Sequence, residues 1–434
     1  MDYDLVIIGA GWAGFNAAQR AKELKLRVAL VDKGPIGGTC LNLGCIPTKT
    51  LLQSAKTLSL AKKSAIFGVN VSNIEIDFAR IQQRKADIIN KLAQGMQGTL
   101  KGVDVINAEA KITSRTVVQA GNTELKTKAI LIATGSKPQQ LPAISFDHTK
   151  ILSSDDILNL KEIPQSLLII GGGVIGCEFA CLFSALGTKV TIVEKMPQLL
   201  PGEDADVAKK LEVSLKKKGI VVATNTDASA YKFDDFALVL LSVGRLPNTS
   251  TIGLESVGVT INRNRIVVDN YLQTNVAGIF AAGDCTGTIM LAHYAAYQGR
   301  LCVHNIAKPL DPLKADNAVV PNCIFTDPEI ASVGLKEETA KHLGISIEIS
   351  KFDFLGSGMA RIIEETDGFV KIITDKNSKK IIGASIIGPR ATELIAGLAI
   401  AIQHKLTVSS LQETIFAHPT LSESIAEAFL NHGV

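Results

Sequence analysis

The chain has 434 residues, which is too long for one hydrophobic core and indicates two to four domains. Its residues are 46% hydrophobic and 20% charged, as in globular proteins, and the formal net charge of +3 gives no electrostatic support for nucleic-acid binding. No run near 20 apolar residues is present, so the sequence predicts no membrane span. Seven cysteines without a closely spaced framework favour a reducing compartment. We therefore expect a cytoplasmic protein, or an organellar matrix protein whose targeting segment was removed.

The first predicted elements form a strand, a glycine turn, a helix and a second strand. Residues 4–8 are an apolar run typical of a buried strand, and the sequence GAGWAG follows at residues 9–14. Residues 27–31 are the second strand, and Asp32 ends it. The glycines allow a tight turn, close approach of the backbone to a pyrophosphate, and close helix–strand packing. These glycines are Gly9, Gly11 and Gly14. The unit predicts a dinucleotide site in which Asp32 accepts hydrogen bonds from the ribose.

Two cysteines, Cys40 and Cys45, follow this unit in the run GGTCLNLGCIPTK at residues 37–49. A flavin bound at the glycine turn could reach them, and a dithiol beside a flavin is a two-electron relay. The apolar stripe of residues 47–61 predicts a helix, whose positive end would raise the thiolate fraction of the second thiol. A structural disulfide or half of a zinc site is the alternative. The CxxxxC spacing is unusual for zinc, and no second pair follows at finger spacing.

The same unit returns in the second part of the chain. An apolar strand at residues 166–170 leads into GGGVIG at 171–176, and a strand at 189–193 ends at Glu194. Glu194 lies as far behind its first glycine as Asp32 does. Two dinucleotides in one chain imply electron transfer between them, with FAD at the first unit beside the dithiol and a nicotinamide nucleotide at the second. Glu194 favours NAD, because a carboxylate repels the 2′-phosphate of NADP, and Lys195 beside it weakens that preference.

These and later motifs resemble the flavin-dependent pyridine nucleotide–disulfide oxidoreductases, from Asp4 to about Phe429. The later motifs are ATG (133–135), GGGVIGCE (171–178), SVGRLPN (242–248), AAGDC (281–285), FTDPEIASVG (325–334) and HPTLSE (418–423). They look most like those of family members that oxidise dihydrolipoamide for 2-oxo acid dehydrogenase complexes. The resemblance implies that NAD⁺ is the electron acceptor. A related reductase of another disulfide, such as a glutathione-type disulfide, is the alternative.

The resemblance implies an α/β fold with two Rossmann-like domains, which bind FAD and NAD, and an α+β interface domain that forms a homodimer. It places the FAD domain at 1–141, a shortened NAD domain at 142–244, a central segment returning to the FAD domain at 245–313, and the interface domain at 314–434. Family members carry a longer β-meander where this chain has only residues 221–236. We therefore expect altered contacts to the adenosine of NAD.

The resemblance also implies the roles of individual residues, in a cycle that needs no metal. Cys40 would be the interchange thiol, Cys45 the charge-transfer thiol against the flavin, and His418 with Glu423 an acid–base dyad supplied by the partner subunit. Contacts to FAD are implied for Lys33, Gly38, Thr39, Lys49, Ala110, Thr134, Gly135, Asp284 and Ala292. Contacts to NAD or the flavin's reactive nitrogen are implied for Gly171, Gly173, Val174, Ile175, Gly176, Glu178, Gly244 and Arg245. Simple packing is the alternative for Ala110 and Ala292, and the sequence predicts it for the other five cysteines, Cys177, Cys181, Cys285, Cys302 and Cys323.

Overall fold

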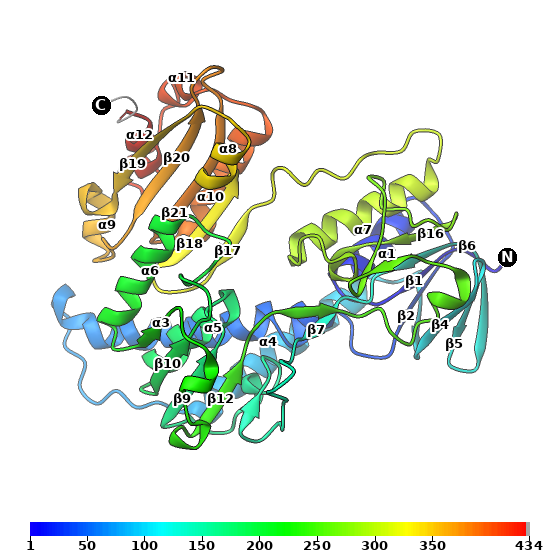
Figure 1. The fold of residues 1–434 in the computed structure, drawn as a ribbon, viewed down its shortest axis with the longest axis horizontal. Coiled ribbons are helices and arrows are strands. Elements are labelled where there is room, and N and C mark those ends of the chain that lie inside the picture. The colour runs from blue at the N-terminus through cyan, green and yellow to red at the C-terminus, as the bar shows by residue number, and fades with distance from the viewer. Residues whose placement is uncertain (431–434) are drawn as a thin grey trace.

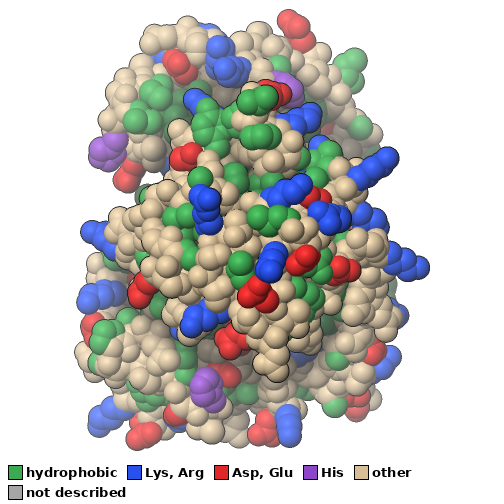
Figure 2. Space-filling view, turned by 90° about the vertical axis from the view of Figure 1, so that its right-hand side faces the viewer, with side chains coloured by type: hydrophobic (Ala, Val, Ile, Leu, Met, Phe, Trp, Pro, Cys, Tyr) green, Lys and Arg blue, Asp and Glu red, His purple; other side chains and the backbone are tan. Residues whose placement is uncertain are grey.

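A computed structural model of the chain describes residues 1–430. Figure 1 shows three lobes, each built around its own β-sheet, with the N-terminus in one lobe and the C-terminal end in another. Lysine, arginine, aspartate and glutamate side chains are interspersed over the face shown in Figure 2, as the nearly balanced net charge leads one to expect. Among the described residues, no helix combines the length and the apolar character needed to cross a bilayer.

The first lobe is a sheet with the strand order β3-β2-β1-β6-β5-β4, and β16 pairs with β6 on the other side. Its parallel strands are β1 (Tyr3–Ile8), β2 (Val28–Asp32), β3 (Asp104–Asn107), β6 (Thr123–Ile132) and β16 (Ile279–Ala281). The antiparallel strands are β4 (Ala110–Ser114) and β5 (Val117–Ala120). Residues 5–8 are buried on both faces of the sheet, which explains their unbroken apolar run. Helices α1 (Trp12–Glu23) and α7 (Ala292–Ala307) pack together in this lobe.

The second lobe is a parallel sheet with the order β11-β10-β9-β12-β8. Its strands are β8 (Ile151–Leu152), β9 (Ser166–Ile170), β10 (Lys189–Val193), β11 (Val221–Ala223) and β12 (Leu238–Leu241), and its helices are α5 (Val174–Ala185) and α6 (Ala205–Lys217). Between β11 and β12 the chain, which is described throughout, forms only the short 3-10 turns η3 (Ala228–Ala230) and η4 (Phe233–Asp235). The nucleotide unit is therefore present without a meander of strands.

The third lobe is an antiparallel sheet with the order β17-β18-β21-β20-β19. The strands are β17 (Asn322–Ile324), β18 (Glu329–Gly334), β19 (Ile347–Asp353), β20 (Phe369–Asp375) and β21 (Ile381–Gly388). Its helices are α8 (Glu337–His342), α9 (Gly358–Ile362), α10 (Ala391–Gln403), α11 (Val408–Gln412) and α12 (Glu423–Leu430). An extended connection over residues 308–321 reaches this lobe from α7 (Figure 1).

Further elements join the lobes. Helix α3 (Cys45–Lys63) packs against both α4 (Phe78–Thr99) and α5 of the second lobe, and β7 (Ser136–Pro138) pairs with β13 (Arg245–Pro247) where the chain crosses between lobes. The remaining short elements are α2 (Gly38–Asn42), η1 (Ser64–Phe67), η2 (Ile157–Asn159), η5 (Glu255–Val257), β14 (Ile261–Asn262), β15 (Arg265–Ile266), η6 (Gly283–Thr286) and η7 (Phe354–Gly356).

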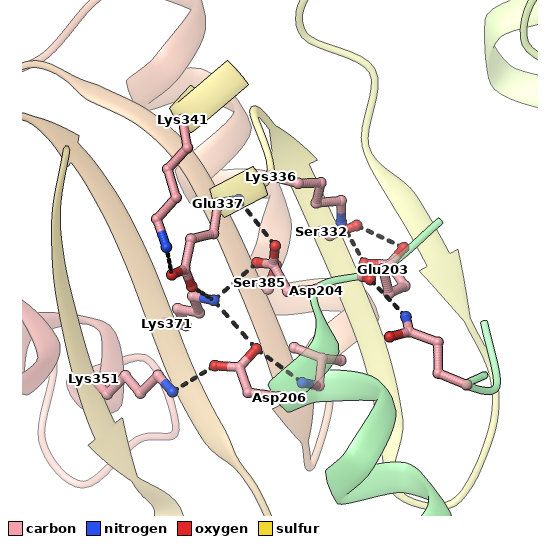
Figure 3. A network of polar contacts seen from close by, with 12 residues as sticks. Glu203, Asp204, Asp206, Ser332, Lys336, Glu337, Lys341, Lys351, Lys371 and Ser385 are labelled. Atoms are coloured by element: carbon pink, nitrogen blue, oxygen red, sulfur yellow. Dashed lines mark hydrogen bonds and ion pairs between the residues drawn. The ribbon is translucent and has the colours of Figure 1, made fainter. Parts of the chain in front are cut away.

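A fully buried lysine ties the second lobe to the third (Figure 3). Lys371 of β20 lies 3.1 Å from Asp204, 3.2 Å from Asp206 and 2.9 Å from Glu337. Burial lowers the pKa of Lys371, but the hydrogen bond to Glu337 and the charges of the two aspartates outweigh that effect and raise the pKa overall. The lysine is therefore a cation that fixes the start of α6 on the antiparallel sheet.

Candidate active site

The first glycine turn is shaped for a phosphate. Gly9 has φ +106°, and a Cβ there would lie 2.3 Å from the Ala133 carbonyl oxygen, so a side chain is excluded. A Cβ on Gly14 would lie 1.8 Å from the Gly9 carbonyl oxygen, which shows how closely α1 approaches the turn. Gly11 is the N-cap of α1 and has only the Cα of Gly38 within 4 Å of its Cβ position. The N-terminal amides of α1 thus face open space and fit a pyrophosphate.

Asp32 lies beside this turn at the end of β2. The amide of Ala10 donates to its Oδ2 at 2.5 Å, and the amide of Gly34 donates to its Oδ1 at 2.7 Å. The carboxylate is thereby oriented where the ribose of a dinucleotide lies. Lys33 points elsewhere, because its exposed side chain pairs with Glu109 at 3.1 Å. Ala110 is buried at the start of β4, in the core cluster of the first sheet.

A cavity of about 340 Å³ gathers residues from distant parts of the chain. It lies between the first glycine turn, α3, the start of α5 and strand β17. Of the residues predicted from sequence it is lined by Gly11, Thr39, Cys40, Cys45, Lys49, Gly135, Val174, Ile175, Glu178, Arg245, Asp284 and Ala292. The cavity therefore adjoins the phosphate cradle on one side and the two cysteines on another. This is the arrangement that a flavin dinucleotide requires.

One wall of the cavity is an ion pair between α3 and α5. Lys49 Nζ lies 2.9 and 2.7 Å from the two carboxylate oxygens of Glu178, whose side chain is 3% exposed. The amide of Phe325 donates to Glu178 at 2.9 Å, and the Lys49 ammonium lies 4.8 Å from the centre of the Phe325 ring. Each charge is thus held by several partners, so the pair is rigid.

The two cysteines of the cavity differ in acidity. Cys45 is the first residue of α3, and Cys40 lies in α2. The hydrogen bond from Cys40 lowers the pKa of Cys45 to about 7, and the charge of Lys49 acts in the same direction. The same hydrogen bond, together with burial, raises the pKa of Cys40 far above its ordinary value. In the dithiol state Cys45 is therefore the thiol that ionises near neutral pH, and Cys40 keeps its proton.

Three other polar residues that line the cavity, Arg245, Ser136 and Asp284, are joined by hydrogen bonds. Arg245 Nε donates to Ser136 Oγ at 2.8 Å, and Ser136 Oγ donates to Asp284 Oδ2 at 2.6 Å. Thr134 Oγ1 donates to the Asn248 carbonyl at 2.6 Å, which ties the ATG segment to the last residue of the SVGRLPN motif. The structure thus places Arg245 at the flavin cavity, and not among the residues that line the second glycine turn.

The second glycine turn repeats the geometry of the first. Gly171 has φ +105°, and a Cβ on Gly176 would lie 2.0 Å from the Gly171 carbonyl oxygen. The amide of Gly172 donates to Glu194 Oε2 at 2.6 Å, as Ala10 does to Asp32. A cavity of about 720 Å³ opens here, and the predicted residues that line it are Gly171, Gly173, Val174, Ile175, Glu194 and Gly244. These residues fit a second dinucleotide, and Val174 and Ile175, which line both cavities, would lie between it and the flavin.

His418 and Glu423 form a hydrogen-bonded pair in the third lobe. His418 Nδ1 lies 2.7 Å from Glu423 Oε1, and the amide of Thr420 donates to Glu423 Oε2 at 2.8 Å. These hydrogen bonds, the one from Thr420 first, hold the pKa of Glu423 below its ordinary value. The His418–Pro419 peptide bond is cis. His418 is 81% exposed, and within the described part of the chain neither residue lines the cavity of its own subunit.

Sequence reasoning missed some of the cavity residues. Cys177, Cys181, Cys285 and Cys302 are buried as predicted, but Cys323 is only partly buried and lines the cavity. The prediction for Cys323 was wrong because β17 is an edge strand with one side on the cavity, and no local pattern reveals that. Trp12 also lines the cavity. The sequence feature that could have predicted this is the position of Trp12 directly after Gly11 in the glycine turn.

This fold and this site belong to a known family. The family model for the pyridine nucleotide–disulphide oxidoreductases matches residues 3–299, and the model for the dimerisation domain of that family matches residues 320–429. The chain therefore belongs to the pyridine nucleotide–disulphide oxidoreductases. The expected family and α/β fold class are confirmed, and FAD and NAD are its cofactors.

Individual proteins that are similar to the chain have names more specific than that of the family. The chain is 40% identical to a dihydrolipoyl dehydrogenase of Geobacillus stearothermophilus, over 99% of this chain and 96% of that protein. It is 38% identical to a dihydrolipoyl dehydrogenase of Bacillus subtilis, over 99% of this chain and 98% of that protein. The crystal structure of LpdA from Mycobacterium tuberculosis superposes with a TM-score of 0.90 and 30% identity, over 98% of each chain. The resemblance thus extends over whole chains.

Proposed function

We propose that the protein oxidises dihydrolipoamide to lipoamide with NAD⁺, through a Cys40–Cys45 redox disulfide and FAD. The observation that carries the proposal is the position of the two thiols at the wall of the flavin cavity, beside the Lys49–Glu178 ion pair, where the pKa values of the two thiols are shifted in opposite directions. It gives the two sulfurs different roles, since one is a thiolate near neutral pH and the other is protonated. Bound in this cavity, FAD supplies the two-electron transfer between the dithiol and NAD⁺.

The thiol chemistry follows from these properties. A thiolate of dihydrolipoamide attacks Cys40 of the disulfide, and Cys45 leaves as a thiolate, which its low pKa favours. The second substrate thiolate then attacks the substrate sulfur of the mixed disulfide. This step closes the lipoamide ring and releases Cys40, so that two electrons remain on the dithiol. The overall reaction converts dihydrolipoamide and NAD⁺ into lipoamide, NADH and one proton.

The proton acceptor for the substrate thiols comes from the second subunit of a homodimer. The His418–Glu423 pair is exposed and does not line the cavity of its own chain, so it is available to a partner. The dimerisation domain of the family matches the lobe that carries it. Glu423 holds Nδ1 and leaves Nε2 free to take the proton. We assign dihydrolipoamide on the lipoyl domain of a 2-oxo acid dehydrogenase complex as substrate, in the reducing environment of the cytoplasm.

The proposal is tested with the purified holoenzyme on a panel of substrates. We expect rapid NAD⁺ reduction with dihydrolipoamide and at least 100-fold lower kcat/KM for NADH-dependent reduction of glutathione disulfide, on the scale by which binding sites separate substrates. Cys45→Ser is expected to abolish lipoamide turnover while FAD remains bound. Full activity of that variant, or a preference for glutathione disulfide, would overturn the proposal.

A second variant tests the acid–base dyad. His418→Gln removes the proton acceptor but keeps a side chain that can hydrogen-bond to Glu423. We expect the reaction of the enzyme with dihydrolipoamide to slow by about 10²- to 10⁴-fold. Reduction of the flavin by NADH, followed by stopped-flow absorbance, should change little because it involves no substrate thiol. Equal slowing of both half-reactions would contradict the role of His418.

A further inference from the structure

Positively and negatively charged side chains line the cavity at the second glycine turn, near the end of β10. Glu194 ends the strand, Lys195 follows it, and Asp227 reaches the same place from the short excursion between β11 and β12. In a Rossmann-type unit this end of the second strand is where the 2′ position of the adenosine ribose lies. The charges here therefore decide between a 2′-hydroxyl and a 2′-phosphate.

Backbone hydrogen bonds hold the excursion against the strand end. The amide of Asn225 donates to the Met196 carbonyl at 3.0 Å, and the amide of Thr226 donates to the Glu194 carbonyl at 3.0 Å. Asp227 follows directly, and its Oδ2 lies 3.7 Å from Lys195 Nζ. The backbone thus fixes Asp227 beside the end of β10, and its carboxylate lies within reach of the exposed Lys195 ammonium.

Asp227 has a second anchor that keeps it ionised. It is the N-cap of η3, and its Oδ1 accepts from the amide of Ser229 at 3.1 Å. Hydrogen bonds from Ser229, and then the charge of Lys195, hold the pKa of Asp227 below its ordinary value. The carboxylate is therefore negative throughout the neutral range.

The balance of charge shows what Asp227 adds. Lys195 is the one cation among the described residues that line this cavity. Glu194 is held in place by the backbone, since its oxygens accept from Gly172 at 2.6 Å and Met196 at 2.7 Å, and its charge remains. Without Asp227, Lys195 would offset Glu194 and offer a cation to a 2′-phosphate. With Asp227 the three groups carry a net negative charge.

We propose that Asp227 is a specificity-determining residue, which pairs with Lys195 so that the site accepts the free 2′-hydroxyl of NAD and rejects the 2′-phosphate of NADP. The proposal rests on the use of NAD in the proposed function. The short segment between β11 and β12 has a function in this proposal, because it brings the Asp227 carboxylate to the end of β10 without additional strands.

The test compares kcat/KM for NADH and NADPH, with lipoamide as acceptor, in the wild-type holoenzyme and in variants. Asp227→Asn removes the charge but keeps an N-cap residue, since asparagine caps as well as aspartate does. We expect this change to raise the NADPH:NADH ratio about three- to tenfold at low salt, and less at high salt. The same ratio measured as affinity, with 2′-phospho-ADP-ribose and ADP-ribose in calorimetry, should shift in parallel.

Two further variants distinguish two explanations of a raised NADPH:NADH ratio in Asp227→Asn. One is the loss of the carboxylate that pairs with Lys195, and the other is a disturbed turn. Adding Lys195→Ala to Asp227→Asn should cancel most of the gain, because the unmasked cation is gone. Ser229→Ala alters the same turn without a change of charge and should leave the ratio at its wild-type value. A gain that persists without Lys195, or an equal gain in Ser229→Ala, would overturn the proposal.

The wild-type enzyme distinguishes failure of this inference from failure of the proposed function. Equal use of NADH and NADPH by the wild-type enzyme would contradict the assignment of NAD as the nucleotide in the proposed function. A clear preference for NADH that Asp227→Asn leaves unchanged would keep the proposed function and remove only the role of Asp227.

Discussion

Glu178 and Lys49 meet across the boundary between two lobes, with both carboxylate oxygens within 3 Å of the ammonium nitrogen. Their effects on the nearby thiolate are opposite. The charge of Lys49 lowers the pKa of Cys45, and the charge of Glu178 raises it. The two members of the ion pair therefore shift the acidity of Cys45 in opposite directions, and both line the cavity.

Glu178→Gln should lower the pKa of Cys45 below about 7, because it removes the carboxylate charge and leaves the Lys49 ammonium unpaired. Glutamine retains an oxygen for the Phe325 amide, so the wall should keep its form. The measurement is the pH dependence of alkylation of the reduced protein by iodoacetamide, with mass spectrometry to identify the modified cysteine. Lys49→Met is the matched opposite change and should raise the same pKa. Shifts in one direction for both variants would contradict this account.

Cys40→Ala should raise the pKa of Cys45 from about 7 toward the ordinary value of 9.0, because the hydrogen bond from Cys40 is the largest cause of its lowering. The thiolate fraction at pH 7 should fall from about half to a few per cent. Alkylation at neutral pH should slow in proportion, and the long-wavelength absorbance of a thiolate against the flavin should weaken. Cys323→Ala, at a third thiol of the same cavity, is the control and should leave the titration of Cys45 in place.

Trp12 offers an optical test of the flavin cavity, because it is the single tryptophan of the chain and lines that cavity. A flavin bound there would lie beside the indole and accept its excitation energy. We expect weak tryptophan emission from the holoenzyme, strong emission after removal of FAD, and quenching again when FAD is added back. Trp12→Phe should remove the signal without loss of FAD binding. Emission that does not respond to FAD would place the cofactor elsewhere.

The extent to which the sequence predicts this site depends on how local each signal is. The two glycine units, their acids and the cysteine pair could be predicted because turn geometry and helix position are properties of short segments. Cys323 and Asn322 could not, since they reach the cavity only when the third lobe docks on the second. That docking depends on Lys371 with Asp204, Asp206 and Glu337, which are spread over three segments without a recognisable motif. Asp227 could not be predicted for a similar reason, because its partner Lys195 follows a different strand.

Glu203 shows how the docked lobes shape the cavity. Its buried carboxylate accepts from Ser332 Oγ at 3.0 Å and contacts Lys336 (Figure 3). It also accepts from Asn322 Nδ2 at 2.8 Å. Asn322 in turn lines the flavin cavity. The next residue along the chain, Asp204, belongs to the Lys371 network. The polar junction between lobes and one wall of the active site are therefore a single hydrogen-bonded structure.

Lys371→Ala should destabilise the protein strongly, because it leaves the buried carboxylate of Asp204 without its cation. The loss of one partner of a buried ion pair costs about 3–5 kcal/mol, whereas an exposed pair contributes less than about 1 kcal/mol. Lys351→Ala is the matched control, since Lys351 is half-exposed and contacts the same Asp206 at 2.5 Å. Thermal unfolding of the two holoenzymes at equal concentration should show a large drop in Tm for the first variant and a small one for the second.

The pH dependence gives this prediction a definite sign. The pKa of Lys371 is raised in the folded protein above its ordinary value of 10.5, so its contribution to stability is fully present at neutral pH. That contribution should disappear as the pH rises through the folded-state pKa, because the unfolded chain has already released the proton. The difference in Tm between wild type and Lys371→Ala should therefore be constant from pH 7 to 9 and shrink at more alkaline pH. A difference that grows with pH would show that the ammonium is not what the three carboxylates bind.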